Sequence, residues 1–153
     1  MITDLAEQIR DRINNRASWP GLTPAQFGNA VVVLDPESRM ELDQKGLYVI
    51  PLASTITEVM GRASPQKAIR QHTIVIIVAQ RFQSTDPNDI DVSDWASIKS
   101  IIDFREELEN YVISGFPIAD MDSEPAREIE LKQRWFVAIT ELIFEESFCL
   151  PQT

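Results

Sequence analysis

The sequence of 153 residues contains only one cysteine, Cys149, and one histidine, His72. A single cysteine cannot form an internal disulfide, so the fold does not require an oxidising compartment. One cysteine and one histidine also fall short of the four ligands of a Cys/His zinc site. We therefore expect a core held together by hydrophobic packing, without disulfides, metal ions or cofactors.

Long hydrophobic runs are also missing. The longest, IVIIVA at 74–79, is far shorter than the roughly 20 apolar residues of a membrane-spanning helix. Residues 1–16, MITDLAEQIRDRINNR, mix acidic and basic side chains and lack the apolar stretch of a secretory signal. We therefore expect a soluble protein that is synthesised inside the cell and has no membrane partner.

Basic residues are scarce. The chain has 14 lysines and arginines against 24 aspartates and glutamates, which gives a formal net charge of −10. Nucleic acid held through phosphate contacts requires a basic face, and KAIRQ at 67–71 is too sparse to form one. The charge therefore disfavours nucleic-acid binding and anionic membrane surfaces, although it says nothing about the fold.

Glycine occurs five times, and none of the glycine-dependent catalytic or phosphate-binding motifs is present. Neither G-x-G-x-x-G nor G-x-x-x-x-G-K-[ST] occurs, so the sequence predicts no dinucleotide or P-loop site. The nucleophile elbow G-x-S-x-G is absent as well.

Hydrophobic residues make up 44% of the chain, which is enough for one domain over residues 1–153. A domain of about 150 residues can bury roughly 68–70% of the surface of its unfolded chain. No internal repeat, low-complexity tract or linker divides the sequence.

The first half of the chain predicts a helix and two strands. The helix is capped by Thr3 and carries an apolar stripe at helical spacing: Ile2, Leu5, Ile9 and Ile13. It ends in NNRASWPGLTP, where Pro20-Gly21 signals a turn. Strands are expected at 29–36, which Asp35-Pro36 stops, and at 46–54. Pro51 lacks an amide donor, so it places the second strand at a sheet edge or ends its pairing early.

Residues 54–68 have no clean period, which fits a loop or a protruding hairpin. In RQHTIVIIVAQRF, 70–82, apolar side chains point to both faces, as in a central strand that is covered on both sides. QSTDPNDID then ends this strand.

A helix follows that is capped by Asp91 or Ser93, with Asp94 adding negative charge near its N-terminus. Its broad apolar stripe consists of Trp95, Ile98, Ile101, Ile102, Phe104, Leu108, Tyr111 and Val112, and Ser114-Gly115 and Pro117 end the helix. Residues 134–148 favour a long strand, although a helix carrying Trp135, Ile139 and Leu142 fits the same segment. Together the elements predict a single α+β domain, with a mixed or mostly antiparallel sheet packed by two main helices.

His72 and Cys149 are the residues most suited to catalysis. Histidine serves in general acid–base chemistry because its unperturbed pKa lies near neutrality, and the other members of a Ser-His-Asp triad can come from distant positions. No serine lies in a nucleophile elbow, so we interpret His72 as a partly buried polar residue at a strand end. A catalytic thiol needs electropositive neighbours, whereas EESF precedes Cys149, so we expect a free cysteine, buried or at a strand end.

The acidic segment ADMDSEPAREIE, 119–130, begins like a calcium loop with Asp120, Asp122 and Glu124 at alternate positions. Its sixth position is Pro125 instead of glycine, and its twelfth is Leu131 instead of glutamate. Paired carboxylates could also hydrolyse glycosides, but this requires a sugar-binding cleft. We therefore expect a solvated acidic loop and no enzyme, and we assign no catalytic, cofactor-binding or metal-binding residue.

The order of the elements resembles that of the small tail-terminator proteins of tailed bacteriophages, which complete the tail and join it to the head. The resemblance rests on size and on the succession N-terminal helix, GLYVIPLAS, an irregular segment, QHTIVIIVAQRF, SDWASIKSIIDFREELENYVIS and WFVAITELIFEESF. It covers most of the chain apart from residues 17–45, and it includes no invariant motif.

The resemblance implies a non-enzymatic virion protein of the tail and neck, assembled in the host cytoplasm. Such subunits close into a hexameric ring that caps the tail tube. The implied partners are further copies of the chain, the tail tube protein, a sheath protein if the tail contracts, and a head-completion or neck protein. DNA passes through the ring without specific binding, and an acidic lumen is compatible with the net charge. Because a ring requires a heterologous interface, we expect 54–68 and 117–128 to supply axial and inter-subunit contacts.

Two other classes remain as alternatives. A small enzyme or ligand-binding domain requires His72, or an acidic pair, to line a pocket. An acidic nucleic-acid mimic requires carboxylates on one face at phosphate-like spacing, whereas the acidic residues here, EPAREIE at 124–130 among them, are scattered along the chain.

Overall fold

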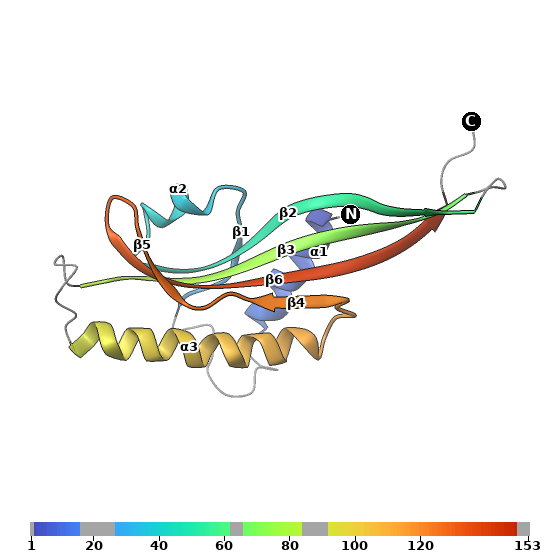
Figure 1. The fold of residues 1–153 in the computed structure, drawn as a ribbon. Helices are drawn as coiled ribbons and strands as arrows, with labels where there is room; N and C mark the ends of the chain where they lie inside the picture. Colours follow the sequence, from blue (N-terminus) through green and yellow to red (C-terminus); the bar gives the residue numbers. More distant parts are fainter. Residues whose placement is uncertain (1, 16–26, 62–65, 84–91, 150–153) are drawn as a thin grey trace.

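The computed structural model describes residues 2–15, 27–61, 66–83 and 92–149, apart from the side chains of residues 92–93 and 112–113. Three long strands dominate it: β2 (Lys45–Met60), β3 (Lys67–Arg81) and β6 (Arg134–Cys149). β3 lies between the other two and pairs antiparallel with both (Figure 1). The prediction that 70–82 is a central strand is therefore confirmed.

Three short strands complete the sheet. β1 (Val31–Val32) pairs parallel with β2, whereas β4 (Asp120–Ser123) and β5 (Arg127–Glu130) pair antiparallel with β6. The main strand order is β1-β2-β3-β6-β4. This mixed, mostly antiparallel sheet confirms the predicted α+β fold class.

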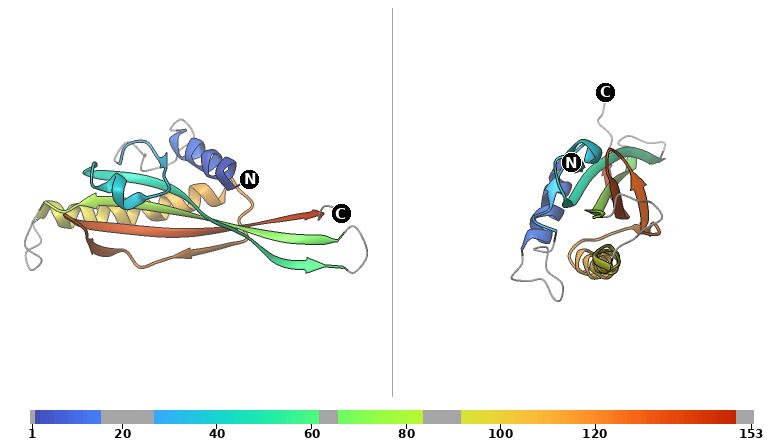
Figure 2. Two further views of the ribbon diagram at one scale, coloured as in Figure 1. Left: turned by 90° about the horizontal axis from the view of Figure 1, so that it is seen from above. Right: turned by 90° about the vertical axis from the view of Figure 1, so that its left-hand side faces the viewer.

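The two main helices pack on the same face of the sheet. α1 (Ile2–Asn14) and α3 (Val92–Ile113) bury apolar side chains against alternate residues of β3 in the larger core cluster. The cluster includes Ile9, Ile13, Phe104, Leu108, Ile74, Ile76 and Val78. In the view along the sheet, the two helices and the strands form separate layers (Figure 2).

A smaller core cluster lies on the opposite face of the sheet. It joins Met40 of the short helix α2 (Pro36–Met40) to Tyr48, Ala79, Trp135 and Val137. Because successive side chains of a strand point to opposite faces, the two apolar sides of β3 and β6 supply both clusters.

β6 settles the ambiguity at 134–148 in favour of a strand, and the helical alternative is wrong. Ala138, Leu142 and Phe144 belong to the larger cluster, whereas Trp135 and Val137 belong to the smaller one. The burial therefore follows a period of two, which a helix cannot produce.

Several predictions near the N-terminus need correction. α1 begins at Ile2, so Thr3 lies inside its first turn instead of capping it. The strand expected at 29–36 contains only Val31–Val32. Asp35 does not end a long strand but caps α2, since its Oδ1 accepts a hydrogen bond from the Ser38 amide at 3.3 Å.

α3 confirms the predicted helix, but its apolar residues do not form the one broad stripe that was predicted. Ile101, Phe104 and Leu108 are buried, whereas Trp95 and Ile102 are exposed on another side of the helix. The proposed cap Asp91 and the turn at Pro20-Gly21 lie outside the described residues. Asp94 is buried and accepts a hydrogen bond from the Gln83 amide at 2.7 Å.

The acidic segment 119–130 is not a loop, because most of it forms β4 and β5. The sheet bonds to β6 satisfy the backbone groups of these edge strands, while most of their carboxylates stay in solvent. The predicted hairpin is confirmed, since β2 runs to Met60, which pairs with Lys67 at the start of β3. In the part of the chain that the structure describes, no helix is long and apolar enough to cross a membrane.

Candidate functional site

A three-stranded arm projects from the body of the molecule. We define it as residues 52–60 of β2, 67–72 of β3 and 144–149 of β6. β1 pairs only with Tyr48 and Val49, and β4 ends its pairing at Ile143, so among the described residues these three strands continue alone (Figures 1 and 2).

The arm exposes apolar side chains that no core cluster covers. On β2, Ile56 is 45% exposed and Val59 is 52% exposed, and Leu52 and Met60 are exposed too. Contiguous exposed apolar patches on a monomeric protein often mark interaction sites. The arm is therefore the first candidate for a functional surface.

The outer edge of β2 is protected against indiscriminate strand pairing. The register with β3 skips Leu52 and Thr57, which marks two bulges, and Pro51 and Glu58 lie beside them. Bulges, proline and charge on an edge strand are the usual obstacles to edge-to-edge pairing. Among the described residues, β3 is the only strand that pairs with β2 at Pro51, so the predicted edge position is confirmed. The pairing of β2 with β3 nevertheless continues beyond Pro51. A partner would therefore contact the side chains of the arm and would not pair as a strand with its edge.

A second exposed apolar surface lies on α3. Trp95, Ile98 and Ile102 follow one side of the helix at spacings of three and four residues, and Trp95 is 59% exposed. We call these three residues the outer stripe. It belongs to the first half of α3, which lies at the end of the molecule opposite the tip of the arm (Figure 1).

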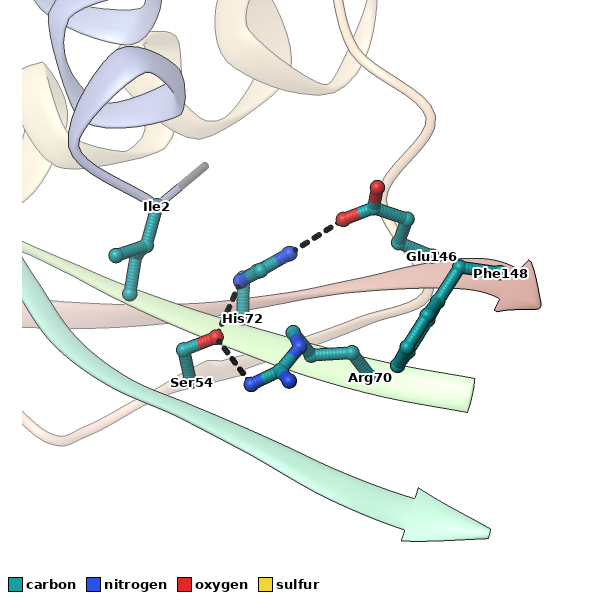
Figure 3. A pocket seen from close by; sticks show the side chains of 6 residues that line it. All are labelled: Ile2, Ser54, Arg70, His72, Glu146 and Phe148. Carbon is teal, nitrogen blue, oxygen red and sulfur yellow. Dashed lines mark hydrogen bonds and ion pairs between the residues drawn. The ribbon is translucent and has the colours of Figure 1, made fainter. Parts of the chain in front are cut away.

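At the root of the arm, one hydrogen-bonded chain crosses all three strands. His72 on β3 lies between Ser54 on β2 and Glu146 on β6, with Nδ1 2.9 Å from Ser54 Oγ and Nε2 2.9 Å from Glu146 Oε2 (Figure 3). The His72 side chain is only 8% exposed, whereas that of Glu146 is 57% exposed. With Nε2 protonated, His72 donates to Glu146 while its Nδ1 accepts from the Ser54 hydroxyl.

The hydrogen bond to His72 holds the pKa of the Glu146 carboxyl below its usual range, and the charge of Arg70 acts in the same direction. Arg70 Nη1 lies 3.5 Å from Ser54 Oγ, and the guanidinium stacks over the Phe148 ring at 5.4 Å. These groups and Ile2 line an open cavity of about 430 Å³ (Figure 3).

His72 was predicted to be a partly buried polar residue at a strand end. It is polar and more deeply buried than expected, with 6% of the residue exposed, and it lies inside β3 and not at a strand end. Ser54 occupies ordinary extended backbone in β2 instead of a strand-to-helix elbow. A serine, a histidine and a carboxylate are nevertheless hydrogen-bonded in the order of a catalytic triad. In the usual triad Nε2 faces the serine and Nδ1 faces the carboxylate, whereas here Nδ1 faces Ser54 and Nε2 faces Glu146.

The other candidate residues lie elsewhere. Cys149 is a free, exposed cysteine at the end of β6, so of the two predicted positions, buried or at a strand end, the second is confirmed. Cys149 is not part of the hydrogen-bonded chain. Asp120 and Asp122 lie on the edge strand β4. Among the described residues, no group of three or more His, Cys, Asp or Glu side chains could hold a metal ion.

Sequence reasoning missed the partners of His72 and the exposure of the outer stripe. Ser54 is 18 residues from His72 in the sequence, and Glu146 is 74 residues away. The strand register could have revealed these partners. Ser54 and Phe144 pair with His72 on the two flanking strands, and Glu146 points to the same face of β6 as Phe144, so Ser54 and Glu146 both lie beside the imidazole.

The chain matches no known protein-family model, and no curated protein is significantly similar to it in sequence.

Proposed function

We propose that the protein is a ring-forming structural subunit of a tailed-bacteriophage virion, a tail terminator that caps the tail tube and joins it to the neck. The observation that carries the proposal is the arm, which holds Ile56 and Val59 in solvent away from both core clusters. A projecting apolar element of this kind is suited to contact a neighbouring subunit.

The positions of the two exposed apolar surfaces support assembly into a ring. The arm and the outer stripe are different surfaces at opposite ends of an elongated molecule (Figure 1). Contact between unlike surfaces of identical subunits is heterologous and repeats from copy to copy, so it closes into a ring when the rotation allows.

The charge of the chain supports a conduit for DNA. The net charge of −10 includes exposed carboxylates on the edge strands, among them Asp120, Asp122, Glu128 and Glu130. Carboxylates repel the phosphate backbone, so DNA would pass such a surface without being held. The proposed partners are further copies of the chain, the tube protein, a sheath protein in a contractile tail, and a head-completion or neck protein.

The proposal is tested by the mass of a variant with a charged arm. In the double variant Ile56→Asp/Val59→Asp, we expect light scattering to give the 17.4 kDa mass of the monomer where the wild-type protein gives a multimer. Thr55→Asp is the matched control, because this exposed neighbour is paired with Gln71 on the other face of the arm. A double variant that assembles like the wild type would contradict a role of the arm in ring formation.

A second candidate function, hydrolysis of an ester, is favoured by the chain Ser54–His72–Glu146 at the cavity. In this reaction Ser54 Oγ would attack the ester carbonyl while its proton passes to His72 Nδ1. The leaving alcohol would take that proton, and water would then release the acid from the serine. Labelling of Ser54 by a fluorophosphonate probe, absent in Ser54→Ala, would support the hydrolase, whereas an unlabelled wild-type protein would eliminate it.

A further inference from the structure

We propose that the cavity at the root of the arm binds a small zwitterion, whose carboxylate meets Arg70 and whose ammonium meets Glu146. The class of ligand is an α-amino acid with an apolar side chain. This inference goes beyond the proposed ring and does not rest on it, because the cavity lies within a single copy of the chain. It assigns a binding function and no reaction.

Arg70 brings a positive charge and hydrogen-bond donors to the cavity. Its side chain is half-buried, and its Nη1 makes one long hydrogen bond, of 3.5 Å, to Ser54 Oγ. A guanidinium carries five N–H donors, and no carboxylate lies within ion-pair distance of Arg70 among the described residues. Stacking on the Phe148 ring holds the guanidinium in place. Arg70 can therefore bind a ligand carboxylate through two parallel hydrogen bonds.

Glu146 brings a negative charge to the same cavity. Its Oε2 lies 2.9 Å from His72 Nε2, whereas Oε1 points away from the imidazole and has no hydrogen-bond partner in the described part of the chain (Figure 3). The hydrogen bond to His72, and then the charge of Arg70, lower the pKa of this carboxyl, so it is ionised at neutral pH. An ionised oxygen that faces solvent can accept hydrogen bonds from a ligand ammonium.

The two charges are neighbours in the sheet, but they do not form an ion pair. Arg70 and Glu146 lie directly opposite each other on β3 and β6, where opposite charges normally interact. Glu146 turns instead to His72. Arg70 turns to Ser54 and to the Phe148 ring. A simple anion would be repelled by Glu146 and a simple cation by Arg70, so the pair of separated charges favours a ligand that carries both.

The rest of the cavity suits an apolar side chain. Ile2 of α1 and Phe148 of β6 supply its apolar lining (Figure 3). The cavity volume of about 430 Å³ is within the range of roughly 300–1,000 Å³ that is usual for small-molecule sites. An amino acid such as leucine combines a carboxylate, an ammonium and a branched apolar side chain, and so matches all three parts of the lining.

Isothermal titration calorimetry with three probes tests the inference on the wild-type protein near neutral pH. L-Leucine carries both charges, N-acetyl-L-leucine keeps only the carboxylate, and L-leucinamide keeps only the ammonium. We expect L-leucine to bind with a Kd of about 1 mM or tighter. Each analogue should bind about tenfold more weakly or worse, because it lacks one charge-assisted contact. No saturable binding of L-leucine, by calorimetry and by ligand-observed NMR, would overturn the proposal, as would an analogue that binds equally well.

Variants locate the site. Arg70→Gln and Glu146→Gln each remove one charge, and each should weaken the binding of L-leucine about tenfold or more. The matched controls are Lys67→Gln and Glu145→Gln, which remove the same charges from the other face of the arm and should bind like the wild type. Circular dichroism should show that all four are folded. Unchanged affinity in Arg70→Gln or Glu146→Gln, or equal losses in the controls, would overturn the proposal.

Light scattering in the same buffer keeps the binding site and the ring distinguishable. A monomer that binds L-leucine supports the site and contradicts the ring. A multimer that does not bind L-leucine overturns the site and leaves the ring.

Discussion

At the scale of single residues, His72 is held by more specific contacts than its neighbours on the arm. Both ring nitrogens are hydrogen-bonded, to side chains from the two flanking strands, and the ring is buried. An imidazole in this position links all three strands where they leave the body. The hydrogen-bonded chain is therefore expected to stiffen the root of the arm.

Replacing His72 by alanine removes both hydrogen bonds and leaves a gap between the strands. A hydrogen-bond loss of this kind, at a buried position, should lower the free energy of unfolding by about 1–3 kcal/mol. Urea denaturation monitored by circular dichroism measures this change. Gln71→Ala is the matched control, since the adjacent side chain makes one exposed hydrogen bond to Glu145, and it should change stability by less than about 0.5 kcal/mol. Equal stability losses in the two variants would contradict the role of His72.

The depressed pKa of Glu146 predicts a dependence of stability on pH. A carboxyl whose pKa is lower in the folded than in the unfolded protein stabilises the fold above the unfolded pKa, and this contribution is lost as the pH falls through the folded pKa. Glu146→Gln should therefore have a lower melting temperature than the wild type at neutral pH. The difference should disappear on acidification below the usual glutamate range, about pH 4. Thermal melts of both proteins from pH 7 to pH 3 measure it, and a difference that grows toward low pH would be the opposite result.

What could be predicted for single residues depended on how local their environment was. The buried polar character of His72 follows from the apolar run in which it lies. Its contacts with Ser54 and Glu146 do not, because they require the alignment of three strands. Helical spacing places Trp95 in one broad apolar stripe with Ile101 and Leu108, but spacing cannot say which side of that stripe meets the sheet.

At the scale of elements, the long strands were predictable and the short ones were not. β3 carries apolar residues on both faces, which predicted a central strand. The pattern of β6 favoured a strand but also fitted a helix, and only the structure decided between them. β1, β4 and β5 contain two to four residues each and are defined only by their partners. The acidic residues of β4 and β5 disfavour a strand locally, but pairing with β6 overrides this preference.

Shortening the arm should separate folding from assembly. Among the described residues of 56–64, none belongs to either core cluster, so deletion of this segment should leave a folded chain with both clusters intact. We expect near-wild-type helical and sheet signals in circular dichroism, a monomeric mass, and loss of tail joining in virion assembly. Tail joining at the wild-type level would contradict a function for the arm.

At the scale of the whole molecule, the fold is elongated, and its arm and outer stripe lie at opposite ends. The charge of −10 opposes contacts other than those that bring cations to carboxylates. Under the proposed function, these features are suited to head-to-tail contacts between copies more than to a symmetric pair. The fold class and the single domain were predictable from composition and periodicity, whereas the arrangement of the surfaces emerges only in three dimensions.

The most direct test of this account is the mass of the wild-type protein by light scattering over a concentration series. A heterologous ring predicts one closed multimer of the 17.4 kDa chain, sixfold by resemblance to tail terminators, whose mass stays constant over a wide concentration range. A monomer at every concentration, or a mass that rises without limit, would contradict the ring.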